Sequence, residues 1–136
     1  MESLIASYLI PGKAVTKKNS QQMVKNPKTG RWFPVPSKAY KEYEKLCKQY
    51  IKPPEKPISE PVNVRCIYHF MLNKDGALPR LLPDLTNLLE ATDDILVKYG
   101  VLEDDNVSIV KTHDGSEAIF GDTDEPYTEI YIRSKE

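Results

Sequence analysis

The chain has 136 residues, of which 40% are hydrophobic and 29% are charged. This length is near the usual size of one domain, and this composition is typical of a folded globular protein rather than a disordered chain. No apolar run approaches the roughly 20 residues of a membrane-spanning helix. Cys47 and Cys66 lack metal-ligand spacing, which indicates core residues in a reducing compartment. We therefore expect a single domain over residues 1–136 that is cytoplasmic and has no membrane partner.

The net charge of −1 conceals two oppositely charged parts of the chain. Residues 12–52 carry eleven Lys or Arg against two Glu, a net charge of +9, whereas residues 53–136 have a net charge of −9. A basic segment neutralises phosphates and an acidic one can hold a divalent cation, so the division favours a metal-dependent nuclease. A solvated basic loop without a ligand is the ordinary alternative.

The first predicted elements are a strand and a long basic loop. Residues 3–10 are rich in β-formers and stop at Pro11-Gly12, and without a basic leader or cleavage site they indicate a first strand rather than a signal peptide. Residues 12–36 show no sustained period and are expected to form a loop. Its basic side chains are the predicted DNA contacts: Lys13, Lys17, Lys18, Lys25, Lys28 and Arg31.

The next predicted element is an amphipathic helix. Ser37 is suited to cap it, apolar residues recur at helical spacing as far as Ile51, and Pro53-Pro54 ends the pattern. Its opposite face is basic and adds to the positive surface, or is an ordinary solvated face: Lys38, Lys41, Lys45 and Lys48.

The second half of the chain predicts strands on either side of a second helix. Residues 62–72 alternate strictly and form the clearest strand, and Pro83-Asp84 opens a helix that ends near Gly100. Its expected apolar stripe is Leu85, Leu88, Leu89, Ile95 and Leu96. Further strands are predicted at 107–112, 118–120 and 127–133. This order predicts an α+β fold, with one mixed β-sheet packed by two helices.

The most informative stretch runs from Pro83 to Asn106. Four polar residues fall on one face of the predicted helix: Asp84, Asn87, Glu90 and Asp94. Stacked carboxylates repel one another, and a bound cation would remove that penalty. Asp104 and Asp105 follow a turn at Gly100 and can lie beside the helix start in a compact fold. Together these carboxylates predict an oxygen-rich magnesium site.

Each acidic residue also has an ordinary structural interpretation. Asp84 is suited to be a helix N-cap, Glu90 and Asp94 to be solvated surface, and Asp104-Asp105 to be a turn. The two histidines, His69 and His113, are expected to be structural. Composition and spacing alone leave these alternatives open.

The same stretch resembles the RusA family of Holliday-junction resolvases, encoded largely by phages and prophages. The family pattern runs Pro-Asp-x-Asp-Asn-x-x-Lys, then a helix with a further Asp, a Gly and an acidic pair before a strand. Seven residues match it at the same spacing: Pro83, Asp84, Asn87, Asp94, Gly100, Asp104 and Asp105. The opening strand, the basic loop and the Ser-Lys-x-Tyr start of the first helix are also similar, so the resemblance spans most of the chain.

Two positions depart from the family pattern. Thr86 replaces the second Asp, and Glu90 replaces the Lys. One interpretation is that Glu90 takes over the ligand role lost at Thr86, and Asp94 is the other candidate. The positive charge that the family pattern has at the position of Glu90 could come from another lysine. The sequence does not distinguish among the candidates, which are Lys74, Lys111 and a lysine of the 12–31 loop.

The resemblance implies a homodimer that nicks two strands of a four-way DNA junction. It implies that Asp84 and Asp105 hold magnesium, or manganese in its place, and that Asn87 orients a ligand, a water or the phosphate. The rival hypotheses are a branched-DNA-binding protein that has lost catalysis through Thr86 and Glu90, and a nuclease acting on flaps or forks.

Overall fold

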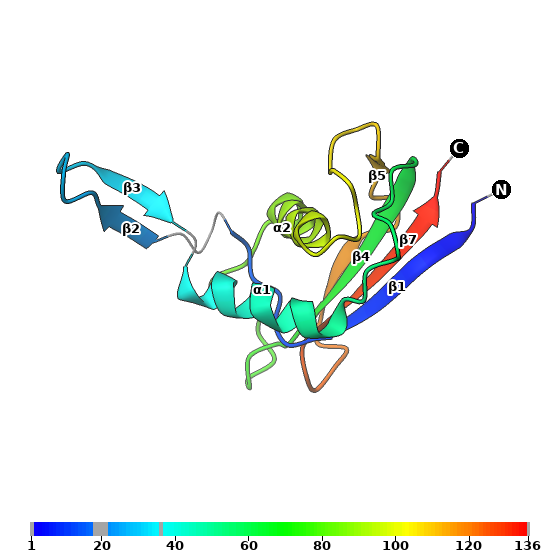
Figure 1. Ribbon diagram of the computed structural model, residues 1–136. Helices are drawn as coiled ribbons and strands as arrows, with labels where there is room; N and C mark the ends of the chain where they lie inside the picture. Colours follow the sequence, from blue (N-terminus) through cyan, green and yellow to red (C-terminus); the bar gives the residue numbers. More distant parts are fainter. Residues whose placement is uncertain (1, 18–21, 36, 136) are drawn as a thin grey trace.

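The computed structural model describes residues 2–17, 22–35 and 37–135. Its centre is a mixed five-stranded sheet in which β1 and β7 are antiparallel neighbours, β7 is antiparallel to β4, and both β5 and β6 run parallel to β4 (Figure 1). The bounds are β1 Leu4–Pro11, β4 Val62–Phe70, β5 Val110–Thr112, β6 Glu117–Phe120 and β7 Tyr127–Ser134. The predicted α+β fold with one mixed main sheet is confirmed.

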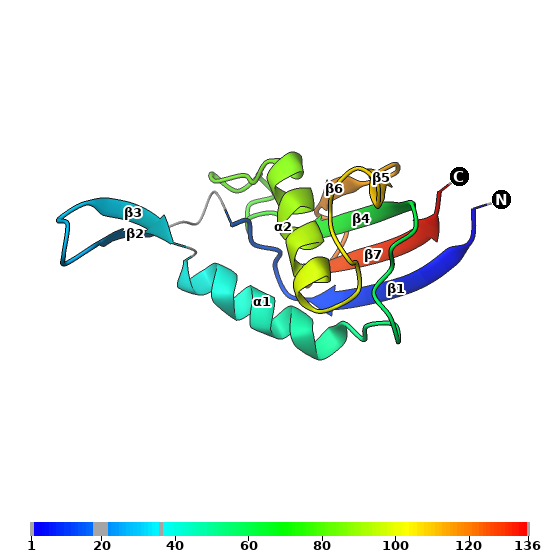
Figure 2. The ribbon, with the colours of Figure 1, turned by 45° about the horizontal axis from the view of Figure 1, so that its top comes forward.

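Two helices, α1 (Lys38–Tyr50) and α2 (Leu85–Lys98), cover one face of this sheet (Figure 2). Ser37 caps α1 as predicted, because its hydroxyl accepts a hydrogen bond from the Tyr40 N–H at 3.1 Å. Alternate β4 residues, from Val62 to Phe70, are buried together with Leu88, Ile95 and other apolar residues of the helices. The period-2 and period-3.6 patterns therefore meet in one hydrophobic core.

The prediction of a loop over residues 12–36 is wrong in part, because two short strands within this range form a small second sheet. Strands β2 (Gln22–Lys25) and β3 (Trp32–Val35) pair antiparallel around a turn (Figure 1). The turn is closed by a hydrogen bond from the Gly30 N–H to the Asn26 carbonyl at 2.8 Å, and Gly30 has a φ of +72°. The sequence missed this hairpin because its strands are four residues long and bury no face, so they lack a polar–apolar alternation.

Two further boundaries differ from prediction. The strand expected at 107–112 begins at Val110, because residues 106–109 form a turn in which the Asn106 carbonyl accepts the Val110 N–H at 2.9 Å. Leu85, expected in the buried stripe of α2, is exposed, whereas Asp93 is buried. The remaining predicted elements, including the strand near 118–120, are present at close to their expected positions.

Membrane insertion through a helix finds no support in the fold. Across the described ranges, neither helix combines the length and the apolar character needed to cross a bilayer.

Candidate active site

Helix α2 presents its acidic residues along an outward face. Asp84 is the N-cap by backbone conformation, yet its carboxylate makes no capping hydrogen bond to the helix. Instead Oδ2 of Asp84 accepts a 3.4 Å hydrogen bond from the Asn87 side chain. Asp84 and Glu90 are exposed, and Asn87 and Asp94 are half-buried. The first turn of α2 therefore offers a carboxylate that is not used to cap the helix.

Asp94 meets Asp105 across the gap between α2 and the loop that follows it. The pKa of the Asp94 carboxyl is raised, first by burial and then by a hydrogen bond with Asp105. The negative charges of Asp105 and Glu90 raise this pKa further, whereas the positive charge of Lys17 lowers it. Two neighbouring carboxyl groups repel when both are ionised, so this arrangement favours a protonated Asp94 or a bound cation.

The loop from Glu103 to Ile109 holds Asp105 in place through its neighbours. Oδ1 of Asp104 accepts the Asp105 N–H at 2.7 Å, and Oδ2 accepts the Asn106 side-chain N–H at 2.9 Å. These hydrogen bonds, first that from Asp105, lower the pKa of the exposed Asp104 carboxyl. Asn106 in turn accepts the Ser108 N–H at 2.9 Å. Asp104 thus shapes the loop, whereas its neighbour Asp105 is the residue that interacts with Asp94.

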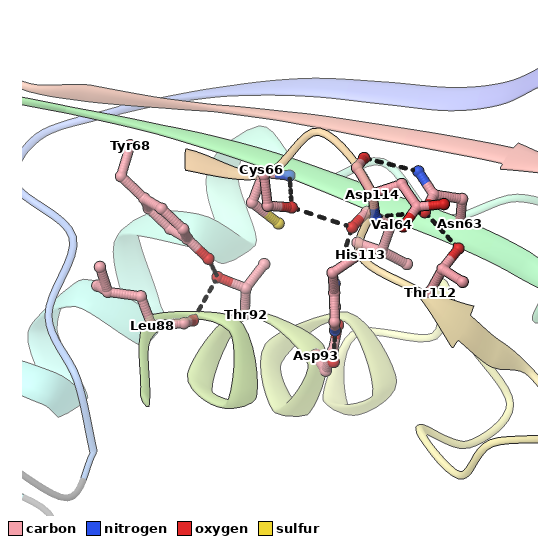
Figure 3. Close-up of polar contacts among 11 residues, drawn as sticks. Asn63, Val64, Cys66, Tyr68, Leu88, Thr92, Asp93, Thr112, His113 and Asp114 are labelled. Carbon is pink, nitrogen blue, oxygen red and sulfur yellow. Dashed lines mark hydrogen bonds and ion pairs between the residues drawn. The ribbon is translucent and has the colours of Figure 1, made fainter. Parts of the chain in front are cut away.

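A partly buried ion pair, which the sequence did not predict, ties this acidic end of α2 to the sheet (Figure 3). Nε2 of His113 lies 2.8 Å from Oδ2 of Asp93, and Nδ1 of His113 donates to the Val64 carbonyl of β4 at 2.8 Å. Burial lowers the pKa of His113, but the bond to Asp93 outweighs it and the net shift is upward. The other oxygen of Asp93, Oδ1, is buried without a hydrogen-bond partner among the described residues.

A second buried contact is made by the preceding residue of the same helix (Figure 3). The Thr92 hydroxyl donates to the Leu88 carbonyl at 2.9 Å and lies 2.6 Å from the Tyr68 hydroxyl. Because the Thr92 hydrogen is already committed, Tyr68 is the donor in the shorter bond. Asp93 and Thr92 together fix the rotation of α2 on β4, which directs Asp94 toward Asp105. The detectable signal in the sequence was that Asp93 borders the apolar stripe of its helix.

A basic groove of about 840 Å³ lies within electrostatic reach of Asp94, which together with Asp105 is called the acidic pair from here on. It lies between α1 and the C-terminal end of α2, where Lys98 of α2 pairs with Glu44 of α1. Its lining residues are Lys17, Lys38, Tyr40, Lys41, Glu42, Glu44, Lys45, Lys48, Lys98 and Tyr99. Lys17 and Tyr40 connect the groove to the acidic pair, because Lys17 acts on the pKa of Asp94 and Asp94 acts on that of Tyr40.

The predicted DNA-contacting residues are distributed over three places. Lys17 lines the basic groove, whereas Lys13 lies beside Leu81 and Pro83 at the start of α2. Three others are exposed on the β2–β3 hairpin: Lys25, Lys28 and Arg31. Lys18 lies outside the described residues.

The predicted metal ligands are brought together only in part. Asp94 interacts with Asp105, and the charge of Glu90 also acts on Asp94. Asp84, however, is separated from Asp94 by ten residues of helix, a rise of about 15 Å. Within the described ranges, no three Asp, Glu, His or Cys side chains are grouped as a ready metal site. The all-oxygen pair does suit magnesium, which takes one or two carboxylates and fills its other positions with water and phosphate.

A comparison with protein-family models now assigns the family, because the model for endodeoxyribonuclease RusA matches residues 11–133. The chain belongs to the RusA endodeoxyribonuclease family. The match runs from the end of β1 into β7, so it includes both helices, the hairpin, the acidic pair and the basic groove. A search of curated proteins found no match. Membership implies nuclease activity in Holliday-junction resolution, which confirms the resemblance seen in the sequence.

Proposed function

We propose that this protein is a magnesium-dependent endonuclease that resolves Holliday junctions in DNA recombination and repair. The observation that carries the proposal is the interaction of the Asp94 carboxyl with Asp105 and with Lys17, which lines a lysine-rich groove. A cluster of carboxylates next to a phosphate-binding surface is the arrangement that metal-assisted hydrolysis of a phosphodiester requires. Cleavage of two strands needs two sites, so we propose that the protein acts as a homodimer.

Asp94 and Asp105 are the residues that we propose hold the cation, and Glu90 adds negative charge beside them. When bound, magnesium or manganese would activate a water and neutralise charge on the scissile phosphate. The chain supplies the rigid frame for this site, because Asp104 holds the loop and the Asp93–His113 pair holds the helix. Asp84 and Asn87 lie at the start of the same face, where we propose that Asp84 is a further acidic site residue and that Asn87 orients it.

Lys17 is our candidate for the cation that the family pattern has at the position of Glu90. Its charge already lowers the pKa of Asp94, so it lies within electrostatic reach of the acidic pair. A lysine ammonium in that position would stabilise the negative charge that develops on the phosphate during hydrolysis. We favour Lys17 over Lys74 and Lys111, the other lysines left open by the sequence, because its charge is among the main influences on the pKa of Asp94.

The basic groove is the surface that we propose grips the DNA backbone. Most of its lysines come from one face of α1, and each phosphate contact releases condensed counterions, so affinity should fall steeply with salt. The Tyr40 hydroxyl is buried in the groove lining without a hydrogen-bond partner in the described part of the chain.

The decisive experiment is cleavage of a labelled, immobile four-way junction with magnesium and with EDTA. Paired, symmetric nicks that require magnesium and are lost in Asp105→Asn would support the proposal. The matched control is Asp124→Asn, an exposed aspartate in the loop before β7, which should leave cleavage unchanged. Unchanged cleavage by Asp105→Asn would overturn the proposed site. Parallel reactions on flaps and forks would reveal a nuclease with another preferred substrate.

One observation favours a second candidate function. Because no three metal-type ligands are grouped among the described residues, a branched-DNA-binding protein without catalysis also fits the structure. It predicts tight binding of four-way junctions and no divalent-dependent cutting in the same assay.

A further inference from the structure

The β2–β3 hairpin extends away from the body of the protein as an arm (Figure 1). None of its residues belongs to the hydrophobic core within the described ranges. A lone two-stranded hairpin is marginally stable in water, and apolar side chains on it gain nothing from the core. An arm that nevertheless exposes large apolar side chains is a candidate contact surface for a partner.

Pairing of the two strands places apolar side chains on both faces of the arm. Lys25 lies opposite Trp32, and Val24 lies opposite Phe33. Trp32 is 61% exposed and Phe33 is 41% exposed, so neither aromatic ring is covered. The face of Trp32 therefore combines an aromatic ring with a neighbouring lysine.

The charge on and around the arm indicates what its partner carries. No Asp or Glu occurs from residue 3 to residue 41, and the arm itself exposes Lys25, Lys28 and Arg31. Lys28 lies at the turn, where its N–H donates to the Asn26 side chain at 2.9 Å. A uniformly basic arm repels a second copy of itself and attracts a polyanion.

Exposed aromatic rings interleaved with basic side chains are the combination that binds nucleic acid bases and backbone together. The lysines and arginine neutralise phosphates, and an aromatic ring stacks on any base because every base has a π-face. Bases inside a duplex are already stacked, whereas stacking is interrupted where strands exchange at a branch point. The chemistry of the arm thus matches a branch point better than a continuous duplex.

We propose that the β2–β3 arm is a branch-point contact in which Trp32 stacks on a base exposed at the crossover. The proposal rests on branched DNA being the substrate. It adds a second DNA-recognition surface, separate from the acidic pair. The arm contacts the position where base stacking is interrupted, while the lysine groove holds the backbone. Phe33, on the opposite face, offers a second ring to the other side of the arm.

Trp32 is the only tryptophan of the chain, which makes its fluorescence a direct reporter. The Asp105→Asn protein, which should not cut, is titrated with a four-way junction and with a linear duplex of equal length. Binding is followed in parallel by the anisotropy of a label on the DNA. The proposal expects strong quenching of Trp32 by the junction and weaker quenching by the duplex at equal saturation. Unchanged fluorescence at saturating junction would overturn it.

Substitution separates stacking from charge. Trp32→Ala should weaken junction binding by roughly ten-fold or more, with a smaller effect on duplex binding, and Trp32→Phe should recover much of the loss. Because stacking releases no counterions, Trp32→Ala should leave the salt dependence of binding unchanged, whereas Lys25→Gln should lower its slope by about 1. The matched control is Leu9→Ala, which removes another exposed apolar side chain, on β1, and should leave binding unchanged.

The same measurements distinguish failure of the arm from failure of the proposed function. A protein that neither binds nor cuts branched DNA would refute the proposed function itself. Full junction binding and cutting by Trp32→Ala would refute only the role of the arm. A tryptophan spectrum that changes with protein concentration in the absence of DNA would also refute it, because the ring would then be covered by a second copy.

Discussion

The acidic end of α2 and the β2–β3 arm are held in opposite ways. At the acidic end, Thr92 and Asp93 accept hydrogen bonds from Tyr68 of β4 and from His113, which follows β5, and Asp104 fixes the adjoining loop. The arm is held by backbone pairing and its turn, and its apolar side chains are exposed. Rigid support suits residues that must keep a geometry for chemistry. A loosely attached surface suits a contact that must adapt to the shape of its partner.

The largest expected effect is on DNA cleavage, from a change at the acidic end of α2. Asp94→Asn should lower the junction-cleavage rate by roughly 100-fold or more, since loss of an outer-shell partner alone costs 10- to 100-fold at metal sites. Its folding stability at neutral pH should be equal or higher, because a raised pKa means that the fold disfavours the ionised Asp94. Cleavage kinetics and urea unfolding measure the two effects. A marked loss of stability would show that Asp94 is structural.

Breaking the Asp93–His113 ion pair, which acts as a brace between α2 and the sheet, should cause the largest loss of folding stability. His113→Ala leaves Asp93 buried without its cationic partner, which should lower the free energy of unfolding by about 3 kcal/mol. Urea unfolding of His113→Ala, Asp93→Ala and the double variant gives the coupling between the two side chains. A coupling close to zero would contradict the role of the pair as the brace of α2.

A smaller effect, on the salt dependence of DNA affinity, is expected from changes in the basic groove. Replacing Lys41 and Lys45 by Gln should lower the slope of log affinity against log salt for junction DNA by about 2, one for each lost phosphate contact. The matched control replaces Lys56 and Lys111, exposed lysines that do not line the groove. An equal change in both double variants would show that only the net charge matters.

A further brace on the other side of the sheet gives the body a pH dependence. His69 is buried between Glu129, 2.6 Å from Nε2, and Asp122, 2.8 Å from Nδ1. Burial lowers the pKa of His69, but these hydrogen bonds outweigh it, and the net shift is upward. The pKa of Glu129 is lowered, first by a hydrogen bond from Tyr131.

The sign of that pH dependence follows from the two shifts. The raised pKa of His69 contributes stability that is fully present below its unfolded value, near 6.5, and is lost as pH rises through the folded value. The lowered pKa of Glu129 contributes stability above its unfolded value that is lost as pH falls through the folded value. Unfolding should therefore require more urea at pH 6 than at pH 9. A His69→Gln variant should lose part of this difference, and the raised pKa of His113 should account for the part that remains.

The smallest expected effect is on the stability of the arm. Trp32→Ser should change the free energy of unfolding by no more than about 0.5 kcal/mol, because the ring is largely exposed and packs on no core residue. Thermal unfolding of the variant measures it. A loss of several kcal/mol would show that the arm packs on the body, and the contrast between the two regions would disappear.

The elements that bury an apolar face could be predicted from local sequence patterns. The alternation in β4, the helical spacing in α1 and α2 and the capping Ser37 each record a local pattern, and burial of those patterns specifies the α+β fold. The family was likewise recognisable from a short motif around Asp84 and its spacing to Asp105. Such features are visible in one dimension because each depends on residues close together in the chain.

Which acidic residues interact depends on the three-dimensional fold. Asp105 contacts Asp94, far along α2 from Asp84, and His113 contacts Asp93 across twenty positions of sequence. Neither contact follows from a periodicity, because each depends on how the loop after α2 returns to the sheet. The arm was missed for a related reason: a strand that buries no face leaves no alternating pattern, and only backbone pairing in space defines it.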